Sequence, residues 1–203
     1  MSSIPVTATR TEEAWELPSS GKVSMLCLIA AESVIFTIFV VAYLYYMGKP
    51  TSGPTPAEIL KVPIVDTICL LSSSFTMHWA TRALRQDRIK AFLLGWGITL
   101  ALGLKFVEGT ATNWYWMIHD KHFTISTSLF GTTFYSLVGL HVSHVIIGLT
   151  GLSLIFVLGL AGKIKQKHFE SVDIFSYYWH FVDAVWVVVF TVVYVISLHG
   201  IQV

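Results

Sequence analysis

The chain has 203 residues, of which 54% are hydrophobic and only 12% are charged, and its formal net charge at pH 7 is +1. Soluble domains carry about twice that share of charged residues, so the composition excludes a soluble globular protein and predicts a polytopic membrane protein. The small net charge gives no indication of nucleic-acid binding. We expect an all-α bundle of five transmembrane helices, with residues 1–20 as a polar cytoplasmic arm and residues 21–203 as one transmembrane domain.

Five stretches of the sequence are apolar and long enough to cross a bilayer as helices. Proline, glycine and charged residues gather in the segments between them, as in the turn-rich loop 48–63. The expected helices cover about residues 22–47, 63–84, 91–117, 125–160 and 174–198. The fourth exceeds the bilayer thickness, so we expect it to tilt or to project into water.

The lysines and arginines lie mostly on one side of the expected helices. With the N-terminus inside, the inner segments hold Arg10, Lys22, Arg82, Arg85, Arg88, Lys90, Lys163, Lys165 and Lys167, and the outer segments hold Lys49, Lys61 and Lys121. The positive-inside rule therefore predicts a cytoplasmic N-terminus and an external C-terminus. Labelling of the loops from either side of the membrane can check this orientation.

Glu32 carries the one charge in the interior of the first expected helix. A lone carboxyl group among apolar side chains loses hydration, so its charged form is disfavoured. Glu32 is either a neutral hydrogen-bond donor or a residue that exchanges protons or contacts lipid. At a rise of about 1.5 Å per residue, it lies near mid-membrane. Histidines of the last two helices lie at a similar depth and are its best candidate partners: His141, His144 and His180.

Two pairs of polar residues interrupt the last two apolar stretches, and each pair is spaced to share one helix face. An aspartate facing lipid would cost ~3 kcal/mol, so the face with His180 and Asp183 should press against other helices. The two pairs could together ligate a metal, because His141 and His144 form a His-x-x-His motif. Membrane di-iron enzymes use more histidines than these, so we expect hydrogen bonds between helices and no metal site. A proton-handling role remains open.

Lys105 and Glu108 are spaced by three residues in the third expected helix. This spacing favours an ion pair within the helix. Because charges at membrane depth normally face protein, we expect the pair to face the bundle.

Four segments together form a pattern known from one family of membrane proteins. They are Lys22-x-x-Met25 with Glu32-Ser33-x-x-Phe36; Thr67 to Ser74; Gly139-x-His141-x-x-His144-Val145-x-x-Gly148; and Tyr178-Trp179-His180-Phe181-Val182-Asp183 followed by Trp186. In these segments the chain resembles subunit III of the haem–copper terminal oxidases. The resemblance spans about residues 21–194.

The resemblance implies a non-catalytic subunit in a complex that reduces oxygen and translocates protons during aerobic respiration, in the bacterial inner membrane. Such a subunit packs on subunit I, contacts other oxidase subunits, holds phospholipid, stabilises the active centre and supports proton uptake. Haem and copper are then expected in partner subunits, with no cofactor bound by this chain. The sequence agrees, since it has no Cys-x-x-Cys-His motif and no copper-binding cysteine pair. The electron donor, cytochrome c or quinol, is not indicated.

The chain also departs from the family pattern. Many members have two further helices before these five, which form a lipid-holding cleft, so the chain resembles the short form of the family. The third helix usually carries a glutamate followed by an aromatic residue, and either Glu108-Gly109 or Asn113-Trp114 occupies that place. Two alternatives stay open: a related accessory subunit of a bacterial nitric oxide reductase, and an autonomous membrane metalloenzyme using His141, His144, His180 and Asp183.

Overall fold

The computed structural model describes residues 19–47 and 56–199. In chain order, its elements are α1 (Ser20–Met47), α2 (Pro56–Ile59), α3 (Ile64–Arg85), α4 (Ile89–His119), α5 (Leu129–Leu160), the 3₁₀ turn η1 (Gln166–His168), α6 (Phe169–Phe190), the π-helical segment η2 (Thr191–Ile196) and α7 (Ser197–His199). The regular structure of these residues is therefore entirely helical, as predicted. The predicted arm, apart from Ser19 and Ser20, and the first half of the loop 48–63 lie outside the described residues.

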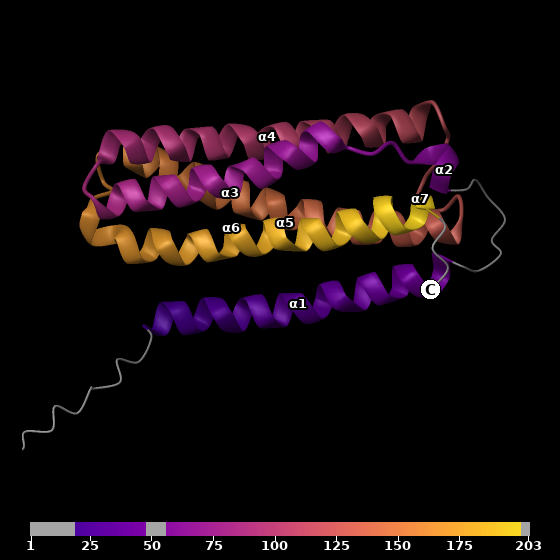
Figure 1. Ribbon diagram of the computed structural model, residues 1–203, viewed down its shortest axis with the longest axis horizontal. Helices are drawn as coiled ribbons and strands as arrows, with labels where there is room; N and C mark the ends of the chain where they lie inside the picture. The colour runs from indigo at the N-terminus through magenta and orange to yellow at the C-terminus, as the bar shows by residue number, and fades with distance from the viewer. Residues whose placement is uncertain (1–18, 48–55, 200–203) are drawn as a thin grey trace, which may run out of the picture.

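Four of the helical stretches are long and apolar enough to cross a membrane: Ser20–Met47, Ile89–His119, Leu129–Leu160 and the continuous run Gln166–Ile196. The remaining predicted span, α3, has 22 residues, which is also long enough to cross a membrane. Its composition is more polar, because it carries a run of three serines and charged residues at both ends. It nevertheless lies alongside the long helices in one five-helix bundle (Figure 1).

The observed helix ends differ from the predicted ones where polar residues extend a helix beyond its apolar stretch or cap it inside that stretch. The last long helix begins at Phe169 and not at Ile174, because its first turns include Glu170 and Asp173. The α5 helix begins at Leu129, four residues later than predicted. There Ser128 acts as the N-cap and accepts a hydrogen bond from the Gly131 N–H at 3.1 Å. Apolarity alone therefore misplaced both ends.

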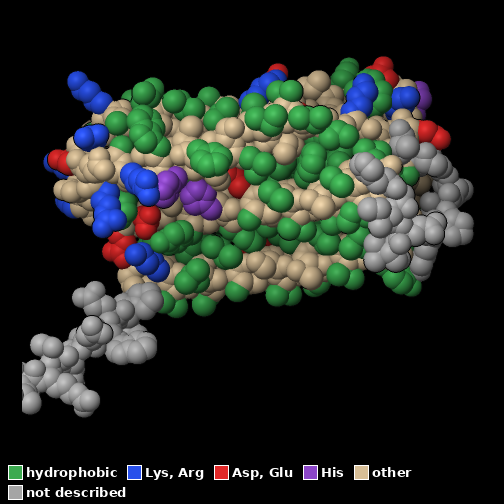
Figure 2. All heavy atoms as spheres, in the orientation of Figure 1, with side chains coloured by type: hydrophobic (Ala, Val, Ile, Leu, Met, Phe, Trp, Pro, Cys, Tyr) green, Lys and Arg blue, Asp and Glu red, His purple; other side chains and the backbone are tan. Residues whose placement is uncertain are grey.

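The bundle has a peripheral helix and a four-helix body. The body is formed by α3 to α6, in which α3 packs on α4 and α6, and α5 packs on α4 and α6. Helix α1 packs mainly on α5 and α6, and Figure 1 shows it along the opposite side of the bundle from α3 and α4. Figure 2 shows apolar side chains along the length of the bundle and most charged side chains toward its two ends. This distribution fits a multi-pass membrane protein.

Three fully buried tryptophans connect the helices of the body. The indole N–H of Trp179 on α6 donates to the Ser73 hydroxyl of α3 at 2.9 Å. The indole N–H of Trp96 on α4 donates to the Leu152 carbonyl of α5 at 3.0 Å. The indole N–H of Trp186 on α6 donates to the Thr67 hydroxyl of α3 at 3.2 Å. Each indole thus fills the core and satisfies its one donor on a neighbouring helix.

The indole of Trp179 fits between two glycines on different helices. A Cβ atom added at Gly103 of α4 would lie 2.9 Å from its ring, and one added at Gly148 of α5 would lie 2.8 Å from it. Small residues let membrane helices approach closely, and here they make room for a buried ring. Gly148 is therefore small because the Trp179 ring needs the space.

We predict that Gly148→Ala destabilises the bundle by about 1–3 kcal/mol, because the new methyl group would overlap the enclosed indole. The matched control is Gly139→Ala on the same helix, where the added Cβ would meet Trp114 at an ordinary 3.5 Å. The free energy of unfolding in mixed micelles measures both changes. Equal stabilities of the two variants would contradict this account of the packing.

Candidate functional site

Glu32 of α1 is hydrogen-bonded to His144 of α5. The carboxylate Oε2 lies 3.1 Å from Nε2 of the imidazole, and both side chains are mostly buried. The other ring nitrogen, Nδ1, lies 2.8 Å from the carbonyl oxygen of Leu140 one turn earlier. That carbonyl oxygen can only accept, so Nδ1 carries a hydrogen. The expected partnership between Glu32 and a histidine of the fourth long helix is therefore present, through His144.

The fixed role of Nδ1 limits how the pair can hold its proton. Either a neutral Glu32 donates its O–H to Nε2, or a protonated His144 donates its Nε2–H to the Glu32 carboxylate. In both arrangements one proton lies between the two side chains and the pair as a whole is neutral. A neutral pair avoids leaving an uncompensated charge inside the membrane.

His141 lies on the same helix but does not join this pair. Its imidazole is fully buried, stacks on Trp186 with ring centroids 5.0 Å apart, and meets the edge of Phe106 at 5.8 Å. Neither ring nitrogen has a hydrogen-bond partner among the described residues. His141, one of the three histidines expected near Glu32, therefore lies among aromatic rings and forms no hydrogen bond with Glu32.

His180 and Asp183 of α6 meet one hydroxyl group of α3. The Ser74 Oγ lies 3.1 Å from Nδ1 of His180, and it also forms a short hydrogen bond to Oδ2 of Asp183. Asp183 is buried, and His180 is half-buried. The face predicted to press on another helix therefore presses on α3. Sequence reasoning missed Ser74 as the partner, although a run of three serines inside an apolar helix is a signal for such contacts.

Lys105 and Glu108 form the predicted ion pair within α4, with Nζ and Oε2 2.9 Å apart. The prediction that the pair faces the bundle is wrong, because 48% of the Lys105 side chain and 66% of the Glu108 side chain are exposed. The side of α4 that faces α5 and the tryptophans of α6 carries Trp96, Gly103 and Phe106 instead. The spacing of two residues in a helix predicts that they form an ion pair, but it does not predict which side of the helix bears that pair.

The four residues considered as metal ligands are divided between different partners. His144 is bonded to Glu32, His141 faces Trp186, and His180 and Asp183 converge on a serine hydroxyl. Among residues 19–47 and 56–199, no group of three His, Cys, Asp or Glu side chains is arranged to hold a metal ion. The polar side chains are used for contacts between helices.

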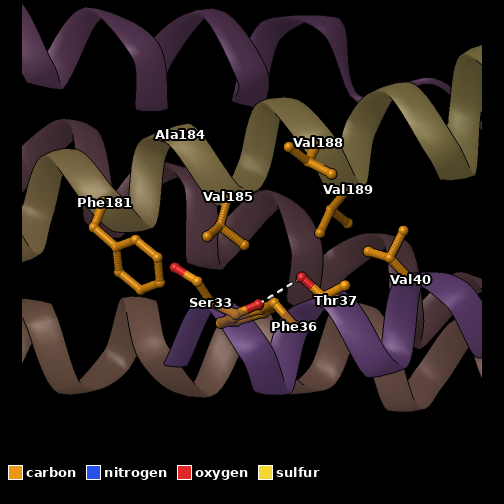
Figure 3. Close-up of a pocket in the computed structure, with 9 residues that line it drawn as sticks. All are labelled: Ser33, Phe36, Thr37, Val40, Phe181, Ala184, Val185, Val188 and Val189. Carbon is orange, nitrogen blue, oxygen red and sulfur yellow. Dashed lines mark hydrogen bonds between the residues drawn. The ribbon is translucent and has the colours of Figure 1, made fainter. Parts of the chain in front are cut away.

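An apolar groove separates parts of α1 and α6 next to Glu32. It has a volume of about 320 Å³. Figure 3 shows its lining, with Ser33, Phe36, Thr37 and Val40 from α1 and Phe181, Ala184, Val185, Val188 and Val189 from α6. The Thr37 hydroxyl donates to the Ser33 carbonyl at 2.7 Å, so that polar group is satisfied within α1. The groove therefore offers a largely apolar surface at membrane depth.

We predict that Asp183→Leu lowers the stability of the bundle by about 1–2 kcal/mol, because Ser74 would lose its buried acceptor. The matched variant Asp183→Asn keeps a carbonyl oxygen for Ser74 and should lose less than half as much. Unfolding in mixed micelles compares them. A leucine variant as stable as the native chain would show that the contact between α3 and α6 contributes nothing.

Comparison with known proteins agrees with this architecture. The family model described as cytochrome c oxidase subunit III matches residues 18–198. The chain is 34% identical to cytochrome c oxidase subunit 3 of Alkalihalophilus pseudofirmus over 85% of this chain and 84% of that protein. It is 29% identical to the subunit of the same name from Thermostichus vulcanus over 94% of both chains. It is 32% identical to the human subunit over 84% of this chain and 67% of that protein. On this evidence, the chain belongs to the cytochrome c oxidase subunit III family of membrane proteins in the respiratory chain.

Proposed function

We propose that the chain is the non-catalytic subunit III of a haem–copper oxidase in a bacterial inner membrane, where it packs on subunit I and stabilises it during turnover. The observation that carries this proposal is the use of the polar side chains. Glu32, His144, Ser74 and Asp183 are bonded from helix to helix and do not surround an open site. Such an arrangement suits a rigid membrane scaffold beside a catalytic subunit. Haem and copper belong to the partner subunits in this proposal.

We also propose that the groove between α1 and α6 holds a phospholipid acyl chain. Seven of its nine lining residues are valine, alanine or phenylalanine, and its volume of about 320 Å³ suits part of such a chain. Lipid in this groove would fill the space between α1 and α6, and α1 itself buries only Phe36 and Tyr43 within the chain. The helix would then be held by lipid as well as by protein.

A contribution to proton uptake is supported by titratable groups near the predicted inner end of the bundle. His180 is half-buried and interacts electrostatically with His78 of α3 and Asp173 of α6. These groups lie on the same side as the basic loops that the positive-inside rule assigns to the cytoplasm. They provide sites at which protons can be held close to the membrane surface.

The relatives favour one electron donor and one class of complex. They are named cytochrome c oxidase subunits, which supports an oxidase over a nitric oxide reductase and cytochrome c over quinol for the complex of this chain. The division of His141, His144, His180 and Asp183 between separate partners gives no support to an autonomous metalloenzyme.

Removal of the chain from the purified oxidase tests the proposed function. We predict that the depleted complex keeps its haem spectrum and its initial rate of oxygen consumption. Its activity should then decay several-fold faster during turnover, because subunit I has lost its supporting bundle. Adding the native chain back should restore the slower decay. Loss of haem on removal of this chain, or an unchanged decay of activity, would contradict the proposal.

A further inference from the structure

The ion pair of Lys105 and Glu108 is exposed on the middle of a membrane-spanning helix. Helix α4 runs from Ile89 to His119, and even its nearer end lies about three turns from Glu108. Side chains near helix ends can reach the membrane surface, but these two lie too far from either end. Figure 2 shows charged side chains midway along the α4 edge of the molecule, apart from those at the ends.

A second acidic residue joins the pair from α3. This helix is shorter than α4 and begins deeper in the bundle, so Asp66 in its first turn packs directly against Gly109 of α4. Asp66 is half-buried and interacts electrostatically with both Lys105 and Glu108. Both acidic side chains therefore lie near the Lys105 ammonium group, and Glu108 contacts it directly.

These residues line a groove of about 530 Å³ between α3 and α4. Its polar lining consists of Asp66, Lys105, Glu108, Thr112 and Asn113. Lys61, at one end of the groove, already places its ammonium group 3.5 Å from the centre of the Trp116 ring. Away from the Lys61 end, the groove holds the two acidic side chains and one lysine, so a basic side chain from outside the chain would complement it.

We propose that this groove docks a transmembrane helix of another oxidase subunit, and that this helix presents a lysine or arginine side chain to Glu108 and Asp66. Ionisable groups within membrane spans normally face protein or a water-filled cavity, because contact with hydrocarbon is costly. Lipid headgroups lie at the surface and do not reach the middle of α4. A basic side chain would neutralise the surplus carboxylate. This inference rests on the proposed membership of an oxidase complex.

A photo-reactive residue in place of Thr112 identifies what covers the groove in the assembled oxidase. Thr112 is exposed and lines the groove beside Glu108. Illumination of the purified complex should join this chain to another subunit, and mass spectrometry should place the junction in one of its membrane helices. Capture of lipid alone, or of a second copy of this chain, would overturn the proposal.

Exchange of the two charges tests the chemistry of the contact. The double variant K105E/E108K keeps an ion pair within α4 but places an ammonium group where the partner helix expects a carboxylate. We expect its retention in the detergent-purified complex, relative to its amount in the membrane, to fall at least about tenfold. The matched control K167E/E170K exchanges an exposed pair of the same spacing at the aqueous end of the bundle and should be retained normally.

Native-like retention of K105E/E108K would overturn the proposal. Should this variant fail to insert, E108Q keeps the shape of the side chain, and its retention should fall about threefold or more; native-like retention of E108Q would overturn the proposal equally. Failure of the unaltered chain to co-purify with an oxidase would instead contradict the proposed function, so the two results are distinguishable.

Discussion

The bundle depends on hydrogen bonds that join polar side chains of different helices at membrane depth, as between Glu32 and His144 and between Ser74 and Asp183. Water cannot satisfy these groups inside the bilayer, so each contact must come from protein. The constraint is clearest for α1, which buries only two side chains in the chain itself. Two polar contacts hold this helix: Glu32 meets His144 near its middle, and the Tyr43 hydroxyl lies 2.8 Å from the Ser197 hydroxyl beyond η2. The position of α1, and with it the groove along α6, follows from these contacts.

The same constraint operates differently in the four-helix body. Here the polar contacts are combined with large buried rings, since the three tryptophans both fill space and donate hydrogen bonds. Trp179 combines the two roles most closely, because two glycines accommodate its ring and Ser73 accepts its N–H. The packing of the rings and the hydrogen bonds of their N–H groups therefore favour the same arrangement of α3, α4, α5 and α6. A body of this kind gives the peripheral helix a fixed surface to bind.

The level of Glu32 and His144 along the bundle was predictable from the sequence, whereas rotation about each helix axis was not. Counting residues from the helix ends placed Glu32, His144, His180 and Asp183 at comparable depths, and the structure pairs the first two. The same reasoning placed His141 near Glu32 too. A separation of three residues leaves two side chains about 60° apart around a helix, and this difference turns His141 toward Trp186.

Rotation also explains the outward position of Lys105 and Glu108. Helix α4 is apolar on most sides, so its sequence does not reveal which side packs on α3 and α5. The serines of α3 were missed for a related reason. A hydroxyl group indicates a contact between two helices only when its acceptor on the other helix is known. The existence of five long helices was predictable from the sequence, although α3 is more polar than the other four and helix ends were misplaced. The contacts that their polar side chains make with one another could be identified only from the structure.

A double-mutant cycle on Glu32 and His144 tests most directly whether the bond between α1 and α5 holds the peripheral helix in place. The free energy of unfolding is measured in mixed micelles for the native chain, Glu32→Leu, His144→Leu and the double variant. Hydrogen bonds between membrane helices contribute about 0.5–2 kcal/mol, and a favourable coupling energy in this range is the predicted result. Additive effects of the two substitutions, with no coupling, would contradict the account.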